Sequence, residues 1–156
     1  YTATVQDLLD IHLEIGASLP TDGAGGEGFD NAAETLFLSP LHSEKYVETA
    51  RLAMDFAAKE FKSRKRLLVA RPGPGLSEEA AARQIAAAFL PKAFRRPVAA
   101  PEVNDFVSLY RAARTRGEEW EPAVFFMLRA ALVSPHFLFR QEPGDYALAS
   151  RLSYFL

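Results

Sequence analysis

The chain of 156 residues contains no cysteine. Disulfides, thiolate metal sites and covalent attachment of haem are therefore excluded for these residues, while the redox compartment stays open. Long apolar runs are missing too, because no stretch approaches the roughly 18 residues that a membrane-spanning helix requires. There is no signal peptide, the first residue is Tyr1 rather than methionine, and the last helical pattern runs to Leu156. We therefore expect a piece of a longer protein, whose targeting signals need not lie within these residues.

The sequence also lacks the motifs that carry common chemistry. It contains no Walker loop, no Gly-x-Ser-x-Gly nucleophile elbow and no dinucleotide-binding fingerprint. The three histidines, His12, His42 and His136, lie far apart and show no metal-ligand spacing. Each could serve as an axial ligand or a general base, but a surface or structural role is the favoured interpretation. Whether the protein is an enzyme is left open by these patterns.

What is present is an ordinary globular composition in which the charges separate along the chain. Hydrophobic residues make up 49% and charged residues 24%, which argues against global disorder. Residues 1–60 hold eleven acids and three bases, whereas residues 61–156 hold nine acids and fifteen bases. We interpret this asymmetry as helping the two halves dock, with steering of a partner as the alternative. The basic run at 61–66 fits a helix C-terminus, and no nucleic-acid-binding motif accompanies it.

Apolar residues recur at helical spacing along most of the chain. The pattern predicts an all-α, multi-helix protein of two small helical modules packed together, with a Gly-rich acidic loop. Helices are expected over about 4–15, 40–61, 77–91, 101–117 and 122–132, and again from 145. Pro91 should kink or end its helix, because proline removes a backbone hydrogen bond. At most one short extended pair is expected, formed by residues 36–38 and 67–69.

The expected helix that starts at Pro40 has a face of small side chains. Its members recur at helical spacing and are Tyr46, Ala50, Ala53, Ala57 and Phe61. Small alanines on one face predict that another helix approaches closely.

The clearest break in the chain is the Arg-Pro-Gly-Pro-Gly stretch at 71–75. It suggests a boundary between two halves. We expect an N-terminal helical module with the Gly-rich loop at 1–62, a linker at 63–76, and a middle helical module at 77–140. Residues 141–156 should be the first helix of a truncated third module.

The Gly-rich loop offers a candidate cation site. Four glycines within residues 23–28 exclude regular structure there. Asp22, Glu27, Asp30 and Asn31 supply oxygen atoms around the turn, and such atoms are the ligands that calcium takes. Their spacing differs from an EF-hand loop, so the alternative is an Asx-turn in which Asp30 or Asn31 caps a short helix. Apart from calcium here, we expect no cofactor in these residues.

Residues 130–140 are almost entirely apolar or aromatic, interrupted by Ser134 and Pro135. We interpret this stretch as a junction at which the middle module ends and the chain turns towards the next one. Arg140 and Arg151 follow apolar segments, so each should pair with carboxylates or carbonyls and act as a structural clamp. His136 has no partner that can be named from the sequence, and we interpret it as structural.

Several stretches match a known family in their sequence and order. They are Thr-Val-Gln-Asp-Leu-Leu at 4–9 after Tyr1, Gly-Phe-Asp-Asn at 28–31, Leu-Ser-Pro at 38–40, Ala-Phe-Arg-Arg-Pro-Val at 93–98, Leu-Val-Ser-Pro-His-Phe-Leu-Phe-Arg at 132–140 and Ala-Ser-Arg-Leu-Ser-Tyr-Phe-Leu at 149–156. With these motifs the chain resembles the planctomycete-type, cytochrome c-associated multidomain proteins, which are assembled from domains of unknown function. The resemblance covers nearly the whole chain.

The resemblance implies three consecutive modules and export to the periplasm or cell surface. It places haem c only in a separate module, so the partners it implies are other modules of the same polypeptide and a cytochrome c. We expect no nucleic-acid partner and no membrane span. No catalytic residue is established for these modules, so none carries over. Relatives often have cysteines where this chain has Ala70 and about Ala81, and a disulfide between them would close about a dozen residues.

Two functions stay open at this point. The first is a non-catalytic helical scaffold or interaction segment of a larger exported, cytochrome c-linked protein, which fits the absence of a catalytic constellation. The second is the wall of a redox or polymer-degrading active site that other modules complete. A pocket lined by His136, Arg140 or Arg151 together with carboxylates would favour the second.

Overall fold

The computed structural model describes residues 1–12 and 40–138. Within these residues the chain forms helices and no strand, so the predicted all-α fold is confirmed. The helices are α1 (Thr2–Leu9), α2 (Pro40–Lys59), α3 (Phe61–Leu67), α4 (Glu78–Phe94), α5 (Ala100–Thr115), α6 (Trp120–Leu132) and α7 (Pro135–Leu138). In the part of the chain that is described, no helix is both long and apolar enough to cross a membrane.

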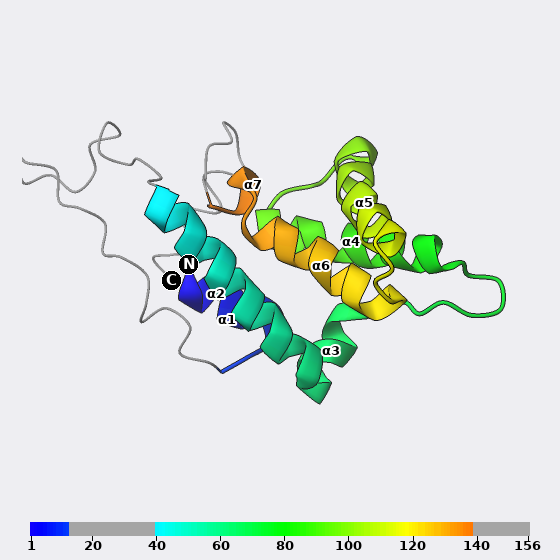
Figure 1. Cartoon of the computed structure of the whole chain (residues 1–156), viewed down its shortest axis with the longest axis horizontal. Coiled ribbons are helices and arrows are strands. Elements are labelled where there is room, and N and C mark those ends of the chain that lie inside the picture. The colour runs from blue at the N-terminus through cyan, green and yellow to red at the C-terminus, as the bar shows by residue number, and fades with distance from the viewer. Residues whose placement is uncertain (13–39, 139–156) are drawn as a thin grey trace, which may run out of the picture.

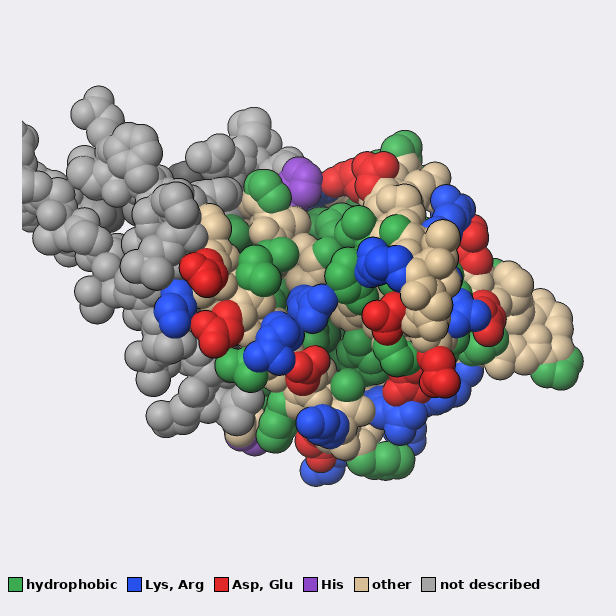
Figure 2. Space-filling model, in the orientation of Figure 1, with side chains coloured by type: hydrophobic (Ala, Val, Ile, Leu, Met, Phe, Trp, Pro, Cys, Tyr) green, Lys and Arg blue, Asp and Glu red, His purple; other side chains and the backbone are tan. Residues whose placement is uncertain are grey.

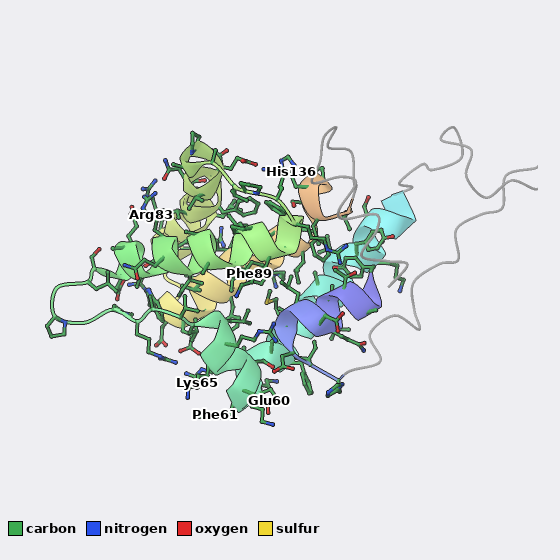
Figure 3. All side chains as sticks on the ribbon, turned by 180° about the vertical axis from the view of Figure 1, so that it is seen from behind. Glu60, Phe61, Lys65, Arg83, Phe89 and His136 are labelled. Atoms are coloured by element: carbon green, nitrogen blue, oxygen red, sulfur yellow. The ribbon has the colours of Figure 1, made fainter. Side chains whose placement is uncertain are left out.

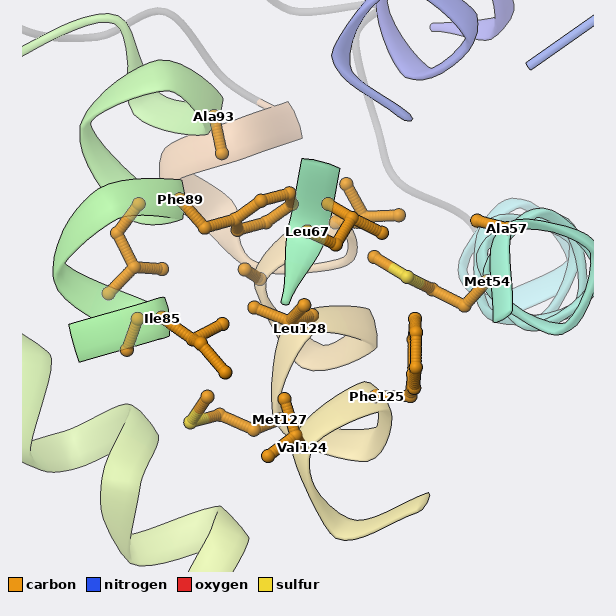
Figure 4. Packing of buried hydrophobic residues seen from close by; sticks show 14 of the residues in the cluster. Met54, Ala57, Leu67, Ile85, Phe89, Ala93, Val124, Phe125, Met127 and Leu128 are labelled. Carbon is orange, nitrogen blue, oxygen red and sulfur yellow. The ribbon is translucent and has the colours of Figure 1, made fainter. Parts of the chain in front are cut away.

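Helix α6 lies at the centre of the described structure and contacts α2, α4, α5 and α7 (Figure 1). Its sequence has little polar surface, so the helix can be stable only if several faces are covered. Ala123, Val124 and Phe125 follow one another around the helix and so point in different directions, and they are 0%, 0% and 8% exposed. Figure 4 shows Leu128 among buried side chains of the surrounding helices, including Ile85 and Leu67. This helix is therefore buried on several sides, as its apolar sequence requires.

Helix α4 begins after a capping serine and continues past the proline inside it. The Ser77 hydroxyl accepts a hydrogen bond from the Ala80 amide at 3.2 Å and so caps the N-terminus of the helix. The helix continues past Pro91 to Phe94, so proline does not end it. The carbonyl that loses its partner belongs to Ala87, whose side chain lies on the exposed face, where water can take the place of the missing donor.

Helix α1 is shorter than the periodicity predicts. It ends at Leu9 because Asp10 adopts a left-handed conformation with φ of 55°, and the Ile11 amide donates to the Gln6 carbonyl at 3.1 Å. Ile11 is then 2% exposed. The expected continuation to residue 15 is therefore wrong between residues 10 and 12, since this left-handed turn buries Ile11 instead of extending the helix.

The long helix expected from Pro40 is divided into two. Ala50, Ala53 and Ala57 are fully buried, which confirms the small inner face. The helix ends at Lys59, however, and Glu60 caps a new helix by accepting hydrogen bonds from the amides of the next turn. Phe61 is consequently 74% exposed, so its prediction as a member of the buried face is wrong.

Residues 67–69 do not form the predicted extended strand. Leu67 ends α3 and Leu68 caps it with φ of −85° and ψ of 66°. The other half of the pair, at 36–38, lies outside the described residues. The break at 71–75 instead forms a tight turn, in which Gly73 and Leu76 exchange two backbone hydrogen bonds of 3.0 Å and Gly75 has φ of 85°. Positive φ explains why glycine stands at position 75.

Helices α1 and α2 run in the same direction. The ring of Tyr1, before α1, lies 4.9 Å from that of Tyr46 in the first half of α2. At the other end, the Ser63 hydroxyl of α3 donates to the Asp10 carbonyl at 3.0 Å. Charged groups of both signs alternate over the face of the molecule shown in Figure 2.

Candidate functional site

The junction predicted around Ser134 is a sharp turn between α6 and the short helix α7. Leu132 is the last residue of α6, and the Ser134 hydroxyl donates to the Ala131 carbonyl at 2.9 Å. The Ser134 carbonyl accepts from the amides of Phe137 and Leu138 at 3.0 and 3.1 Å. Pro135 starts α7, a position at which its missing amide proton costs nothing. Ser134 and Pro135 therefore turn the chain between α6 and α7, and the start of a third module beyond this turn stays a prediction.

One side of α7 packs on the N-terminal part of the chain. The ring of Phe137 meets that of Tyr1 edge to face, with centroids 5.6 Å apart. The ring of Tyr1 also lies against that of Tyr46 at an angle of 54°. The Tyr1 hydroxyl donates to the Leu132 carbonyl at 3.4 Å. Burial raises the pKa of this hydroxyl above its ordinary value. These contacts connect α1, α2, the end of α6 and α7 in one aromatic cluster.

The other side of α7 packs on the middle helices. The His136 ring lies 5.3 Å from the ring of Phe94, the last residue of α4. Its Nδ1 is 3.3 Å from a terminal nitrogen of Arg96, so a neutral imidazole can accept a hydrogen bond there. The sequence analysis found no partner for His136. The structure supplies two, and it places His136 at the edge of the α4–α5 connection (Figure 3).

Arg96 is held in place by a carboxylate of α5. Its two terminal nitrogens donate to the two oxygens of Glu102 at 3.0 and 2.6 Å, and one of them also donates to the Pro97 carbonyl at 3.1 Å. Glu102 in turn accepts from the Ala99 amide at 3.1 Å, which is the carboxylate half of a capping box. The alanine at the cap position has no hydroxyl to supply the other half. The hydrogen bonds from Arg96 lower the pKa of Glu102 to about 2.

Two more arginine–carboxylate clusters join other helices. Glu79 at the start of α4 accepts from Arg111 of α5 at 2.8 and 2.6 Å and from Arg83 at 3.3 Å, and its pKa falls to about 2, chiefly through Arg111. Glu121 of α6 binds Arg64 of α3 through both oxygens, and Arg64 lowers its pKa. Each cluster pairs an acid with a fixed cation. These carboxylates are therefore held ionised, which suits cross-linking of helices better than general acid catalysis.

Most of the other residues singled out from the sequence lie outside the described residues. They are Asp22, Glu27, Asp30, Asn31, Arg140 and Arg151, so the calcium site and the two arginine clamps stay predictions. His12 is exposed at the far end of α1 from the junction. Among the described residues, no group of three or more histidines and carboxylates lies close enough to hold a metal ion.

Sequence reasoning missed the Arg96–Glu102 pair and the role of Tyr1. A signal for Glu102 was present, because it follows Ala99 and Pro101 at the third position of a helix, where an acid reaches back to the cap. No comparable local signal marks Arg96 or Tyr1. Glu102 lies only six residues from Arg96. The contact of Arg96 with His136 spans 40 residues and that of Tyr1 with Leu132 spans 131, so only the fold brings these residues together.

The depressed pKa of Glu102 predicts a specific dependence of stability on pH. The folded state holds this carboxyl ionised down to about pH 2, whereas the ordinary pKa of a glutamate carboxyl is 4.5. Its contribution to stability is therefore complete above about pH 4.5 and is lost as the pH falls towards about 2. We expect Glu102→Gln to unfold at a lower temperature than the unmodified chain at pH 7, and the difference to shrink steadily between pH 4.5 and 2. Melting curves at half-unit steps of pH measure this.

The control for this prediction is Glu118→Gln. Glu118 is exposed, and its carboxylate makes no ion pair with the described residues. Its melting curve should follow that of the unmodified chain at every pH. A difference in melting temperature between Glu102→Gln and the unmodified chain that stays constant from pH 7 to pH 2 would contradict the assigned role of the Glu102 carboxylate.

Two segments of this chain are similar to known families of domains. Residues 1–59 match a family model described as a protein of unknown function, DUF1587, and residues 81–142 match another with the same description, DUF1595. No curated protein and no solved structure matches significantly. Residues that match DUF1587 include Tyr1 and Tyr46, and residues that match DUF1595 include all of α7, so the contact of Phe137 with Tyr1 joins the two matched segments. The chain is therefore similar to a DUF1587 domain followed by a DUF1595 domain.

Proposed function

We propose that this chain is a non-catalytic helical scaffold, an interaction segment of a larger exported protein that is linked to a cytochrome c. The observation that carries the proposal is the double attachment of α7. Phe137 packs on Tyr1 of the first domain, and His136 packs on Phe94 and Arg96 of the second. A turn held from both sides fixes the direction in which the chain continues, as a scaffold requires.

The charged groups at the junction support the same function. Glu102 is paired with Arg96 through both oxygens and is ionised over the physiological range. An ion pair of this kind holds α5 against the end of α4 but has no proton to give near neutral pH. His136 is the remaining titratable group of this cluster, and it lies against the arginine and not against a free carboxylate.

The link to an exported cytochrome c rests on the resemblance of the motifs at 93–98 and 132–140 to such proteins and on the order of the two matched domains. An antibody raised against this chain tests it on the natural protein. In the exported fraction of the source cells, we expect it to detect a polypeptide heavier than 17.2 kDa that stains for covalently bound haem. A haem-free band confined to the cytoplasm would overturn this part of the proposal.

The scaffold role predicts that Phe137 couples the two domains. We expect Phe137→Ala to increase amide exchange in α1 and the first half of α2 by about fivefold, because losing roughly 1 kcal/mol of packing favours local opening there. Helices α4 and α5 should keep their protection. Hydrogen exchange followed by mass spectrometry measures both.

The matched control is Phe56→Ala, which removes an aromatic ring that is 37% exposed on α2 and lies away from α7. It should leave the exchange of α1 unchanged. Equal effects of the two variants on α1 would contradict the role of α7.

The rival function, the wall of an active site, makes a different prediction for the natural protein. His136→Ala would then abolish turnover in a protein that stays folded. Under the scaffold proposal the same variant changes domain coupling and leaves the chemical step as it is. Turnover or haem binding by the purified chain itself would also contradict the scaffold.

A further inference from the structure

Helix α3 turns one face inward and the opposite face to solvent. Ser63 and Leu67, one turn apart, are buried, and the Ser63 hydroxyl binds the end of α1. Phe61, Lys65, Lys62 and Arg66 follow one another around the remaining arc of the helix and are exposed. Figure 3 shows Phe61 and Lys65 at the outer end of α3, projecting from the body of the molecule. The fold therefore presents an aromatic ring and three cations on one short helix.

Two side chains here are exposed in a way that folding does not require. Phe61 is 74% exposed and Val69 is 56% exposed, the two largest values among the large apolar side chains that are described. Glu60 caps α3 through the amides of Lys62 and Ser63, which fixes the start of the helix and hence the outward direction of Phe61. Phe61 begins α3 and Val69 follows its end, so an exposed apolar side chain lies at each end of this basic helix.

The cations of this region differ in whether they already have an acidic partner. Arg64 is bound to Glu121, and a terminal nitrogen of Arg66 lies 3.8 Å from a carboxylate oxygen of Asp10. Among the described residues, the ammonium groups of Lys62, Lys65 and Lys92 have no acidic partner. Positive charge is therefore available around Phe61 and Val69. We define the α3 surface as Phe61, Lys62, Lys65, Arg66, Val69 and Lys92.

A small hollow lies next to this helix, where α1, α3 and α4 meet. Its apolar wall includes Leu8, Leu67 and Phe89, and Arg66, Val69 and Lys92 complete the lining. The hollow is far too small for a drug-sized ligand, but the end of one aliphatic side chain fits such a space. Apolar space beside two cations suits an aliphatic residue that is followed by carboxylates.

We propose that the α3 surface binds an acidic protein segment that inserts one aliphatic side chain into the hollow. This inference rests on the proposed function as an interaction segment and names the partner's chemistry. Lys62, Lys65 and Lys92 pair with its carboxylates, while Phe61 and Val69 cover its apolar atoms. Phe61 is the most exposed large apolar side chain of the described residues and is the expected hot spot.

A protein segment fits this surface better than a membrane does. Only one aromatic ring projects strongly, and the carboxylates of Glu60 and Asp10 lie at the edges of the surface. An anionic bilayer would repel those carboxylates over a broad contact area, whereas a narrow segment can avoid them. The hollow also has room for the end of one side chain, and a fluid bilayer has no defined side chain to place there.

The test uses the full chain and a fluorescein-labelled peptide of four Glu-Asp-Leu repeats, with binding followed by fluorescence anisotropy. We expect saturable binding that weakens at least tenfold from 50 to 500 mM salt. Lys62→Glu with Lys65→Glu should weaken binding at least tenfold, and Phe61→Ser about fivefold. The control is Lys45→Glu with Arg51→Glu, which reverses the same number of charges on the exposed face of α2 and should change affinity less than twofold.

A second variant tests the hollow. Ala88→Leu places extra atoms in the lining, and the peptide with serine in place of leucine has nothing to insert. Ala88→Leu should weaken the leucine peptide several-fold and leave the serine peptide unchanged. Circular dichroism confirms that each variant is folded.

Three outcomes would overturn the proposal. One is equal loss of affinity in the α2 control, which would mean binding by net charge alone. The others are binding to phosphatidylglycerol vesicles, or to a DNA duplex, that depends on Lys62 and Lys65 while the peptide does not bind. None of these results changes the expected haem-stained polypeptide, so failure of this inference and failure of the proposed function are distinguishable.

Discussion

Replacing Leu128 by alanine is expected to lower the free energy of unfolding by about 3 kcal/mol. Leu128 is 1% exposed on α6, the helix that α2, α4, α5 and α7 all contact. Truncation removes buried methyl groups and leaves a cavity that helices on several sides cannot all close at once. Urea unfolding followed by circular dichroism measures the loss as a lower midpoint at unchanged slope.

The matched control is the same leucine-to-alanine substitution at an exposed position. Leu52 is 42% exposed on α2, so Leu52→Ala should cost about 1 kcal/mol or less. Similar losses for the two variants would mean that α6 is not the centre of the core.

Replacing Ala53 by leucine is expected to cost about 2 kcal/mol for the opposite reason. Ala50, Ala53 and Ala57 are fully buried on the face of α2 that approaches the rest of the protein, including α6. Three extra carbon atoms at position 53 force the helices apart or force side chains out of their preferred rotamers. Thermal unfolding should show a lower midpoint, together with greater exposure of apolar surface to a dye such as ANS.

The control is Ala87→Leu on the exposed face of α4. Leucine and alanine are both good helix formers, so this variant should be nearly neutral. A stabilised Ala53→Leu protein would show that the α2 face contains unfilled space and would contradict close helix approach.

Most of the helical faces could be predicted from the sequence. In α4, α5 and α6 the apolar residues repeat at helical spacing and the starts carry Ser77, Pro101 and Pro122, so local rules and tertiary burial agree. The break at Glu60 could not be predicted in the same way. The pattern of small residues continues through Phe61, and glutamate is not among the preferred N-cap residues.

The turn around Ser134 and its contacts also differ in whether the sequence could predict them. Its turn was predictable, because Ser134 and Pro135 interrupt an apolar run and punctuate the chain locally. Its contacts were not, because Arg96 reaches His136 across 40 residues and Tyr1 reaches Leu132 across 131. Side chains this far apart are brought together by helix packing, which a periodic pattern implies only in general terms.

The contact of Tyr1 with Leu132 and Phe137 has a consequence for the order of folding. It closes a loop of more than a hundred residues, and such closure costs more chain entropy than contacts within α4, α5 and α6. During synthesis the first helix leaves the ribosome long before its partners at 132 and 137 exist. We therefore expect α1 to be among the last of the described elements to gain its native packing, although it precedes its partners in the chain.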